Sequence, residues 1–274
     1  MSIYVTKGEK KNEYHAINEQ KQVVGKGWIF PSVPSDIFGY PRLNVFIEMK
    51  VEQCDDQLAI KDLLFATLLE KAKEIRSENR EKKVRVYHCC FSHDQEAIKY
   101  YSEKSGFQHD EGMYIIRKVM SDTPPQVTDT PEVNYEALPL SSEEDIVQLI
   151  NAHQTVFRSG YSVEGIKELQ EKFGWKSIAA IHNGEIVGNI MLWVNEENPN
   201  HPFGWVEDLF VTKDVRHKGI GKNLVAQALA HFRDLHVPEI RIEVWSANER
   251  AMNLYKQFGF SFYEETESSI GMFL

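Results

Sequence analysis

Between a predicted strand and a predicted helix, the chain reads Arg216-His217-Lys218-Gly219-Ile220-Gly221. The first turn of a helix leaves backbone N–H groups unpaired, and the helix dipole favours an anion at that end. Glycines let the backbone approach a phosphate closely, and Arg216, Lys218 and Lys222 add positive charge. The stretch therefore predicts a pyrophosphate-binding loop, although a glycine-rich turn with solvated basic residues would have the same short pattern.

Two other phosphate-binding loops fit this stretch less well. A P-loop has Ser or Thr after its lysine, whereas Asn223 follows Lys222. A dinucleotide fingerprint also fails, because its third glycine would fall at Leu224. It would also require the preceding strand to be the first of the domain, and this strand is not the first.

The elements expected around the loop indicate a mixed α+β domain. A strand is predicted at 205–211 and a helix at 219–236, followed by a strand at 240–245 and a helix at 248–258. The order predicted for residues 132–274 is β-α-α-β-β-β-α-β-α-β-β.

Two local motifs support this order. Asn183-Gly184, between two apolar runs, predicts a β-hairpin. Ser141, followed three residues later by Glu144, predicts a capping box that opens a helix.

The chain of 274 residues has room for two domains of ordinary size. Residues 121–131 are rich in Pro, Thr and Asp and have no apolar period, which is typical of a linker. We therefore expect one domain at 1–120, the linker at 121–131 and a second domain at 132–274.

The two halves share a short pattern. Residues 96–101 before Gly106-Phe107 resemble residues 250–255 before Gly259-Phe260, with one inserted residue between them. This match predicts a diverged duplication.

The composition excludes several classes of protein. A net charge of −10 argues against a nucleic-acid-binding protein. No secretory signal and no uncharged apolar run of about 18 residues is present, so a soluble cytoplasmic protein that does not bind membranes is expected. Cys54, Cys89 and Cys90 are expected to be buried free thiols rather than redox or metal-binding groups, and no metal is predicted.

Taken together, Trp205 to Phe260 resembles the coenzyme A-binding core of the GCN5-related N-acetyltransferase (GNAT) superfamily. The resemblance rests on Arg216-x-x-Gly219-x-Gly221 after a strand, then a helix, a strand and Asn248-x-x-Ala251-x-x-x-Tyr255-x-x-x-Gly259-Phe260. It extends over about 140 residues. It implies two GNAT-like acyl-CoA N-acyltransferase domains, each with a mixed, mostly antiparallel sheet flanked by helices, and acetyl-CoA (coenzyme A) as cofactor.

The resemblance also implies where the cofactor binds. In the family, pantetheine lies where the fourth and fifth strands splay apart, and the pyrophosphate sits on amides of the glycine-rich loop. Asn248 would contact the pantetheine arm. The implied cofactor-binding residues are Leu209, Phe210, Val211, Arg216, His217, Lys218, Gly219, Ile220, Gly221, Lys222, Asn223, Asn248 and Tyr255.

Three residues receive catalytic or substrate-binding roles from the resemblance. Tyr255 would be the general acid that protonates the departing thiolate, unless it only packs under its helix. Glu207 would be the general base and Asp208 an acid that binds the acceptor, with a solvent-facing acid as the alternative for Glu207. Because neighbouring residues of a strand face opposite sides, only one of the two acids is expected to point at a given side. The implied reaction is direct attack by an amine, with a backbone N–H of the fourth strand stabilising the oxyanion.

The N-terminal half lacks such a loop. Its counterpart reads Glu52-Gln53-Cys54-Asp55-Asp56-Gln57, with no glycine and three acids that would repel a pyrophosphate. This half resembles a degenerate GNAT domain with a structural or acceptor-shaping role.

The charge distribution bears on the acceptor. Residues 132–274 hold 12 Lys and Arg against 21 Asp and Glu, a net charge of −9. With Glu196 and Glu197 also expected near the cleft, a cationic small molecule such as a polyamine or aminoglycoside is favoured as the acceptor. A protein N-terminus or lysine, and an acyl-CoA sensor without turnover, are the alternatives. A monomer or a homodimer is expected.

Overall fold

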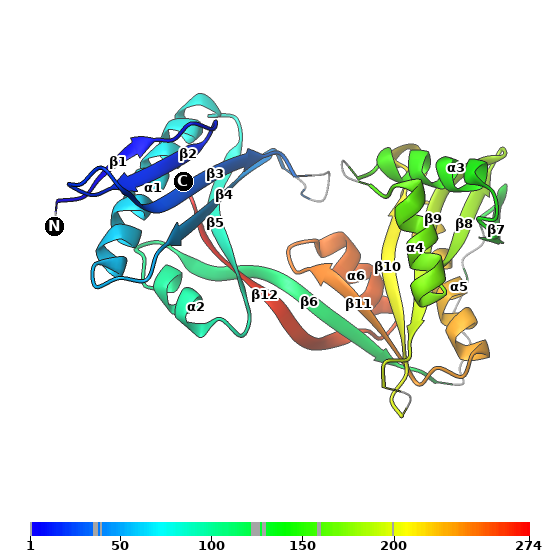
Figure 1. The fold of residues 1–274 in the computed structure, drawn as a ribbon. Helices are drawn as coiled ribbons and strands as arrows, with labels where there is room; N and C mark the ends of the chain where they lie inside the picture. The colour runs from blue at the N-terminus through cyan, green and yellow to red at the C-terminus, as the bar shows by residue number, and fades with distance from the viewer. Residues whose placement is uncertain are drawn as a thin grey trace. The chain divides into compact units, whose positions relative to one another are not determined.

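The structure, a computed structural model, describes residues 2–34, 38, 40–121, 127, 130–157, 160–198 and 200–274. The chain divides into two compact units (Figure 1). Unit 1 comprises Met1–Met113 together with Glu265–Leu274, and unit 2 comprises Tyr114–Glu264. Within the predicted linker at 121–131, residues 122–126, 128 and 129 lie outside the described residues.

Unit 2 is built on a mixed sheet in the order β6-β11-β10-β9-β8-β7. Strands β7 to β10 pair antiparallel, whereas β10 and β11 pair parallel. The strands are β6 (Gln108–Val119, from residue 114 onward), β7 (Val133–Leu138), β8 (Lys176–His182), β9 (Glu185–Asn195), β10 (Phe203–Val211), β11 (Glu239–Trp245) and the start of β12 (Ser261–Phe273). The helices are α3 (Glu143–Gln154), α4 (Val163–Phe173), the 3₁₀ turn η1 (Lys213–Val215), α5 (Ile220–Asp234) and α6 (Glu249–Gln257).

Two apolar cores cover the two faces of this sheet. Ile190 packs in one core with Phe232 of α5, while its neighbour Met191 packs in the other with Leu149 of α3 and Ile166 of α4. Successive residues of a strand point to opposite faces, so β9 is buried on both sides. We call the side of the sheet with Met191, α3 and α4 the α3/α4 face, and the side with Ile190 and α5 the α5 face.

One of the two local motifs is confirmed and the other is shifted by one residue. Asn183 and Gly184 have φ values of 51° and 80°, as a tight hairpin turn between β8 and β9 requires. The capping box is formed by Ser142 and Asp145, not by Ser141 and Glu144 as predicted. Helix α3 starts at Glu143, and its apolar residues pack in the core on the α3/α4 face of unit 2.

Unit 1 has a sheet in the order β1-β2-β3-β4-β5-β12-β6. Strands β1 to β4 are antiparallel, and β4 and β5 pair parallel through α1. The elements are β1 (Tyr4–Lys7), β2 (Glu13–Ile17), β3 (Val23–Ser32), β4 (Arg42–Val51), α1 (Gln57–Glu78), β5 (Lys83–Phe91) and α2 (Gln95–Ser102), with residues 108–113 of β6 and residues 265–273 of β12.

The last strand of the chain completes unit 1, which differs from the domain boundaries expected from the sequence. β12 pairs antiparallel with β5, from Glu267 opposite Phe91 to Phe273 opposite Arg85. Ile270 of β12 is fully buried in the core of unit 1. Residues 265–274, assigned above to the second domain, therefore belong to unit 1, and residues 114–120 to unit 2.

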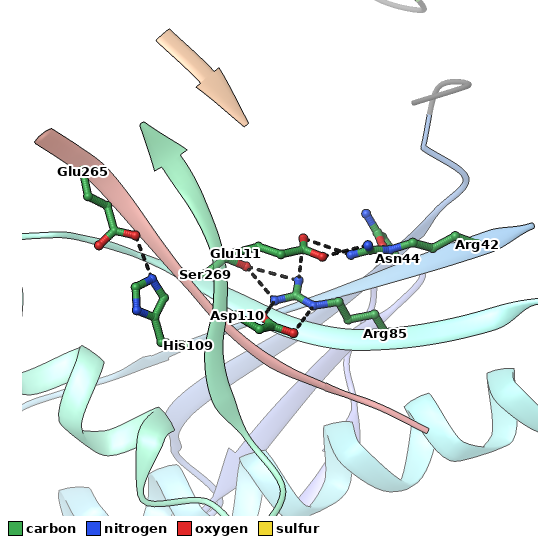
Figure 2. Close-up of polar contacts among 8 residues, drawn as sticks. All are labelled: Arg42, Asn44, Arg85, His109, Asp110, Glu111, Glu265 and Ser269. Atoms are coloured by element: carbon green, nitrogen blue, oxygen red, sulfur yellow. Dashed lines mark hydrogen bonds and ion pairs between the residues drawn. The ribbon is translucent and has the colours of Figure 1, made fainter. Parts of the chain in front are cut away.

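A buried ion-pair network joins β4, β5, β6 and β12 inside unit 1 (Figure 2). Arg42 binds both carboxylate oxygens of Glu111, at 2.7 and 3.0 Å. Arg85 is fully buried and binds Asp110, Glu111 and the Ser269 hydroxyl. Since buried charges are costly unless they are paired, this network fixes how the four strands align.

No helix among the described residues combines the length and the apolar character needed to cross a membrane.

Candidate active site

The site of unit 2 begins where β10 and β11 separate. Their parallel ladder holds three pairs, Gly204–Ile240, Trp205–Arg241 and Val206–Ile242. In the described range 200–274, residues 207–211 of β10 have no ladder partner in β11. Apart from the Val211 carbonyl, which accepts from Arg216 Nε, their main-chain groups on that side are therefore available to a ligand. Leu209, Phe210 and Val211 occupy the positions predicted for this stretch.

A β-bulge lies at the same point of β10. Val206 pairs with Leu192 of β9 and Leu209 with Ile190, so Glu207 and Asp208 together oppose one residue, Met191. A bulge inserts one residue into the strand and changes the side to which the following side chains point. Both acids consequently contact residues of the α3/α4 face, and the expectation that they face opposite sides is wrong.

Glu207 is held by two indoles. Trp205 Nε1 donates to Glu207 Oε2 at 2.8 Å, and Trp193 of β9 also hydrogen-bonds this carboxylate. Loss of solvation raises the pKa of Glu207 above its ordinary value, even though the residue is exposed, and the two indole hydrogen bonds oppose this rise. The nearby charges of Asp208 and Glu243 raise the pKa further. A carboxyl tuned upward in this way suits a general base.

Asp208 is anchored from the other side. Tyr161 donates its hydroxyl proton to Asp208 Oδ2 at 2.7 Å, and His153 Nε2 lies 3.2 Å from the same oxygen. His153 comes from the end of α3, and Tyr161 immediately precedes the N-cap of α4. Burial raises the pKa of the Tyr161 phenol, and the charge of Asp208 adds to this rise.

Tyr255 of α6 lies in the core on the α5 face, with its ring 5.7 Å from that of Phe260. It is buried, as the packing alternative expected. Burial raises the pKa of its phenol above the ordinary value, and the charge of Asp208 adds to the rise. Tyr255 is therefore protonated at neutral pH and lies within electrostatic reach of Asp208 on β10. Packing and a role as proton donor are both compatible with this placement.

The glycine-rich loop forms the N-terminus of α5. Gly219 is the N-cap with φ of 88°, and no side chain caps the helix. In the described range 200–274, the backbone N–H groups of residues 217–222 donate to no main-chain carbonyl outside the helix. A Cβ at Gly221 would meet only side chains at 3.7 Å, so glycine is not needed there for packing within the chain.

The other predicted cofactor residues of this loop differ in their burial and contacts. Arg216 Nε donates to the Val211 carbonyl at 2.9 Å, which ties the loop to the end of β10. His217 is exposed with φ of 65°, and Lys218 and Lys222 are exposed. Ile220 is buried in the core, so only its main chain faces the loop.

Asn223 differs from its predicted role. Its backbone N–H donates to the Gly219 carbonyl, and its side chain donates to Thr130 Oγ1 and the Tyr135 hydroxyl. The amide of Asn223 is thus used inside the helix, because the fourth N–H of the turn already has its i−4 acceptor. Asn248 caps α6 through its side chain, which accepts from the Ala251 N–H at 3.2 Å, and its Nδ2 group is left for other partners.

Glu196 and Glu197 line a cavity of about 640 Å³ in unit 2. Trp193, which also binds Glu207, is part of the same lining. Lys172 and Lys176 line the cavity too, so the two acids there are balanced by two bases.

Four residues that shape this site were not predicted from the sequence. Trp193 and Trp205 bind Glu207, whereas His153 and Tyr161 bind Asp208. The two tryptophans lie opposite each other in the β9–β10 pair. They could have been matched from the sequence only if the register between these two strands were known. His153 and Tyr161 are about 50 residues from β10, and no local pattern links them to it.

Unit 1 repeats the separation of parallel strands but closes it with its own side chains. The β4–β5 ladder ends at Phe46 and Tyr87. Immediately beyond it, His88 Nδ1 donates to the Ile47 carbonyl at 2.7 Å, and Tyr101 stacks on the His88 ring at 4.2 Å. The main-chain group that would face a ligand is thus already bonded.

Splayed parallel strands, a bulge carrying two acids and an uncapped helix N-terminus are together typical of an acyltransferase site. Residues 146–260, which lie in unit 2, match the Acetyltransferase (GNAT) family, so this part of the chain is an acetyltransferase domain of the GNAT type. The family match lies within unit 2, and the fold of both units is consistent with two GNAT-like domains.

Three known proteins illustrate the similarity. The chain is 26% identical over 107 residues to the probable spermine N(1)-acetyltransferase of Bacillus subtilis subsp. natto, covering 37% of this chain and 70% of the relative. It is 26% identical over 137 residues to an N-alpha-acetyltransferase of Sulfolobus acidocaldarius, covering 47% and 81%. The crystal structure of a GCN5-related N-acetyltransferase from Sphaerobacter thermophilus covers 96% of this chain and 80% of its own, with a TM-score of 0.52 and 15% identity, which shows a shared fold.

Proposed function

We propose that this protein transfers the acetyl group of acetyl-CoA to a primary amine of a cationic small molecule, of the polyamine or aminoglycoside type. Glu207 acts as base, Tyr255 as acid and Asp208 as the acid that binds the acceptor. The observation that carries the proposal is the bulge in β10, which puts Glu207 and Asp208 on one face of the sheet where β10 and β11 separate.

The loop at the start of α5 fits the anionic part of the cofactor. Its free N–H groups and the side chains of Arg216, Lys218 and Lys222 favour a pyrophosphate. Glycine at 221 has no packing reason in the chain itself, which supports close approach by a ligand. When bound, acetyl-CoA supplies the thioester from which the acetyl group is taken.

The residues of the chain then account for the proton transfers. Glu207 removes a proton from the acceptor ammonium, directly or through a water, and the freed amine forms the N–C bond as the C–S bond breaks. The protonated phenol of Tyr255 donates its proton to the departing thiolate, and the second proton that the nitrogen loses as the amide forms returns through water to the Tyr255 phenolate. A main-chain N–H of residues 209–211 stabilises the developing oxyanion.

The acceptor class follows from the acids at the bulge. The negative charges of Asp208 and Glu243 raise the pKa of Glu207. A cationic acceptor would relieve the repulsion among these three carboxylates. Similarity to the spermine N(1)-acetyltransferase supports the same class. Similarity to the N-alpha-acetyltransferase keeps a protein N-terminus as the second candidate acceptor.

The test is a thiol-release assay with acetyl-CoA against polyamines, aminoglycosides, amino acids and peptides, on the wild type and Tyr255→Phe. Turnover of one amine class that falls by about 10²-fold or more in Tyr255→Phe, with unchanged coenzyme A affinity, supports the proposal. Binding of coenzyme A without any turnover favours the sensor, and preference for peptides favours the protein acetyltransferase. Failure to bind coenzyme A overturns the proposal.

A further inference from the structure

Within the part of the chain that the structure describes, the hydrogen bonds of the Asp208 carboxylate are made by one of its two oxygens. Both the Tyr161 hydroxyl, at 2.7 Å, and His153 Nε2, at 3.2 Å, approach Oδ2. Within the described ranges 130–157, 160–198 and 200–274, Oδ1 has no hydrogen-bond partner. Two donors on one oxygen fix the rotation of the carboxylate and leave the second oxygen for a ligand.

His153 is fixed by its surroundings. The residue is 3% exposed, and its ring packs against the rings of Phe157, Tyr161 and Phe210 at centroid distances of 4.5, 5.1 and 5.7 Å. Because a carboxylate can only accept, Nε2 must carry the proton in this pair. Nδ1 is buried and has no hydrogen-bond partner among the described residues. The packing therefore fixes the imidazole ring, and among the described residues its hydrogen bond is the one to Asp208.

We infer that His153 and Tyr161 are positioning residues that hold Asp208 Oδ2, so that Oδ1 is directed at the ammonium group of the acceptor. This inference rests on the proposed function. Neither residue touches the reacting atoms, so both act through Asp208 on acceptor binding. The α3–α4 region thereby sets acceptor affinity, while the loop at the start of α5 serves the cofactor.

The substitution Tyr161→Phe tests this role because it removes one hydroxyl and keeps the ring. With spermidine as the probe, the KM for the amine is expected to rise about tenfold, the loss expected for one hydrogen bond to a charged group, while the KM for acetyl-CoA stays within about twofold. Tyr100→Phe is the matched control, because it also removes a tyrosine-to-aspartate hydrogen bond, to Asp62, but in unit 1. Its KM for spermidine is expected to equal that of the wild type.

His153 provides a rescue experiment. His153→Leu removes the donor and is expected to raise the KM for spermidine about tenfold, whereas His153→Gln keeps an N–H at a similar reach and is expected to restore most of the affinity. A merely structural role would lower the melting temperature and alter both KM values, without this difference between Leu and Gln.

The outcomes separate the two proposals. If the wild type acetylates spermidine or another amine and Tyr161→Phe leaves the amine KM unchanged, the positioning role is overturned and the proposed function stands. If the wild type binds coenzyme A but acetylates no amine, the proposed function fails and the positioning role fails with it. A rise in the KM for acetyl-CoA equal to that for the amine would also overturn the positioning role.

Discussion

Glu207 and Asp208 are neighbours in β10, yet both side chains contact the α3/α4 face of unit 2, Glu207 through Trp193 and Asp208 through His153. The bulge opposite Met191 creates this arrangement. In the proposed reaction, Glu207 exchanges a proton while Asp208 stays bound to its two donors. The predictions below test the parts of this site separately.

Glu207→Gln is expected to lower kcat/KM by about 10²–10⁴-fold, because the base is lost. The pKa of Glu207 is raised in the folded protein, so its ionisation disfavours the fold as pH rises through that pKa. At neutral pH the variant is therefore expected to melt at the wild-type temperature or slightly higher. Steady-state kinetics and thermal melts check both points, and full activity of Glu207→Gln would exclude this residue as the base.

Trp205→Phe is expected to move the acid limb of the kcat/KM–pH profile to higher pH by up to about one unit. The indole hydrogen bond lowers the pKa of Glu207, so its loss lets that pKa rise. Trp175→Phe is the control, since the buried Trp175 Nε1 has no partner among the described residues. A shift toward lower pH, or an equal shift in both variants, would contradict the assignment.

Gly221→Ala is expected to weaken coenzyme A binding about tenfold or more without loss of stability. The added Cβ meets only ordinary contacts at 3.7 Å, and alanine is the better helix former by up to about 1 kcal/mol. By contrast, a Cβ at Gly188 would lie 3.0 Å from the Phe210 carbonyl, so Gly188→Ala is expected to destabilise the fold. Calorimetric titration with coenzyme A and chemical denaturation distinguish the two effects. Unchanged affinity of Gly221→Ala would remove the loop from the cofactor site.

Coenzyme A is expected to bind with a stoichiometry of one per chain. In unit 1, His88 and Tyr101 occupy the place where β4 and β5 separate. Isothermal titration calorimetry measures the stoichiometry directly. Two equivalents would show that unit 1 keeps a cofactor site despite its acidic loop.

Arg85→Leu is expected to destabilise the protein by about 3–5 kcal/mol, because Asp110 and Glu111 lose a buried partner. Lys71→Ala, which breaks an exposed ion pair with Glu74, is expected to leave the stability almost unchanged, because solvent screens exposed charges. Urea denaturation compares the two variants. Equal stability of both would mean that the network in Figure 2 contributes little.

Local features of the fold were predictable from the sequence, whereas long-range pairings were not. Asn183-Gly184 specifies its turn through backbone conformation alone, and the structure confirms that hairpin. The apolar pattern of residues 270–274 indicates a strand, but a strand's own sequence does not name its partner. β12 pairs with β5, whose residues precede it by more than 170 positions.

The same limit applies to the site. The loop and helix around Gly219 follow from adjacent residues, and the structure confirms a helix that begins at Ile220. The bulge depends on how β9 aligns with β10, and the sequence Val206-Glu207-Asp208 has no feature that predicts an inserted residue. His153 and Tyr161 reach Asp208 only through the packing of α3 and α4, so their contribution becomes visible only in three dimensions.

The pairing of β12 with β5 has a consequence for synthesis on the ribosome. β5 is made about 180 residues before its partner β12, so at about 5–20 residues per second it waits roughly 9–36 seconds for its neighbour. During that interval Arg85, the buried cation of β5, has no Ser269 to bind. Unit 1 is consequently begun before unit 2 but completed after it, and the nascent chain must protect an open strand edge until residues 267–273 have been made.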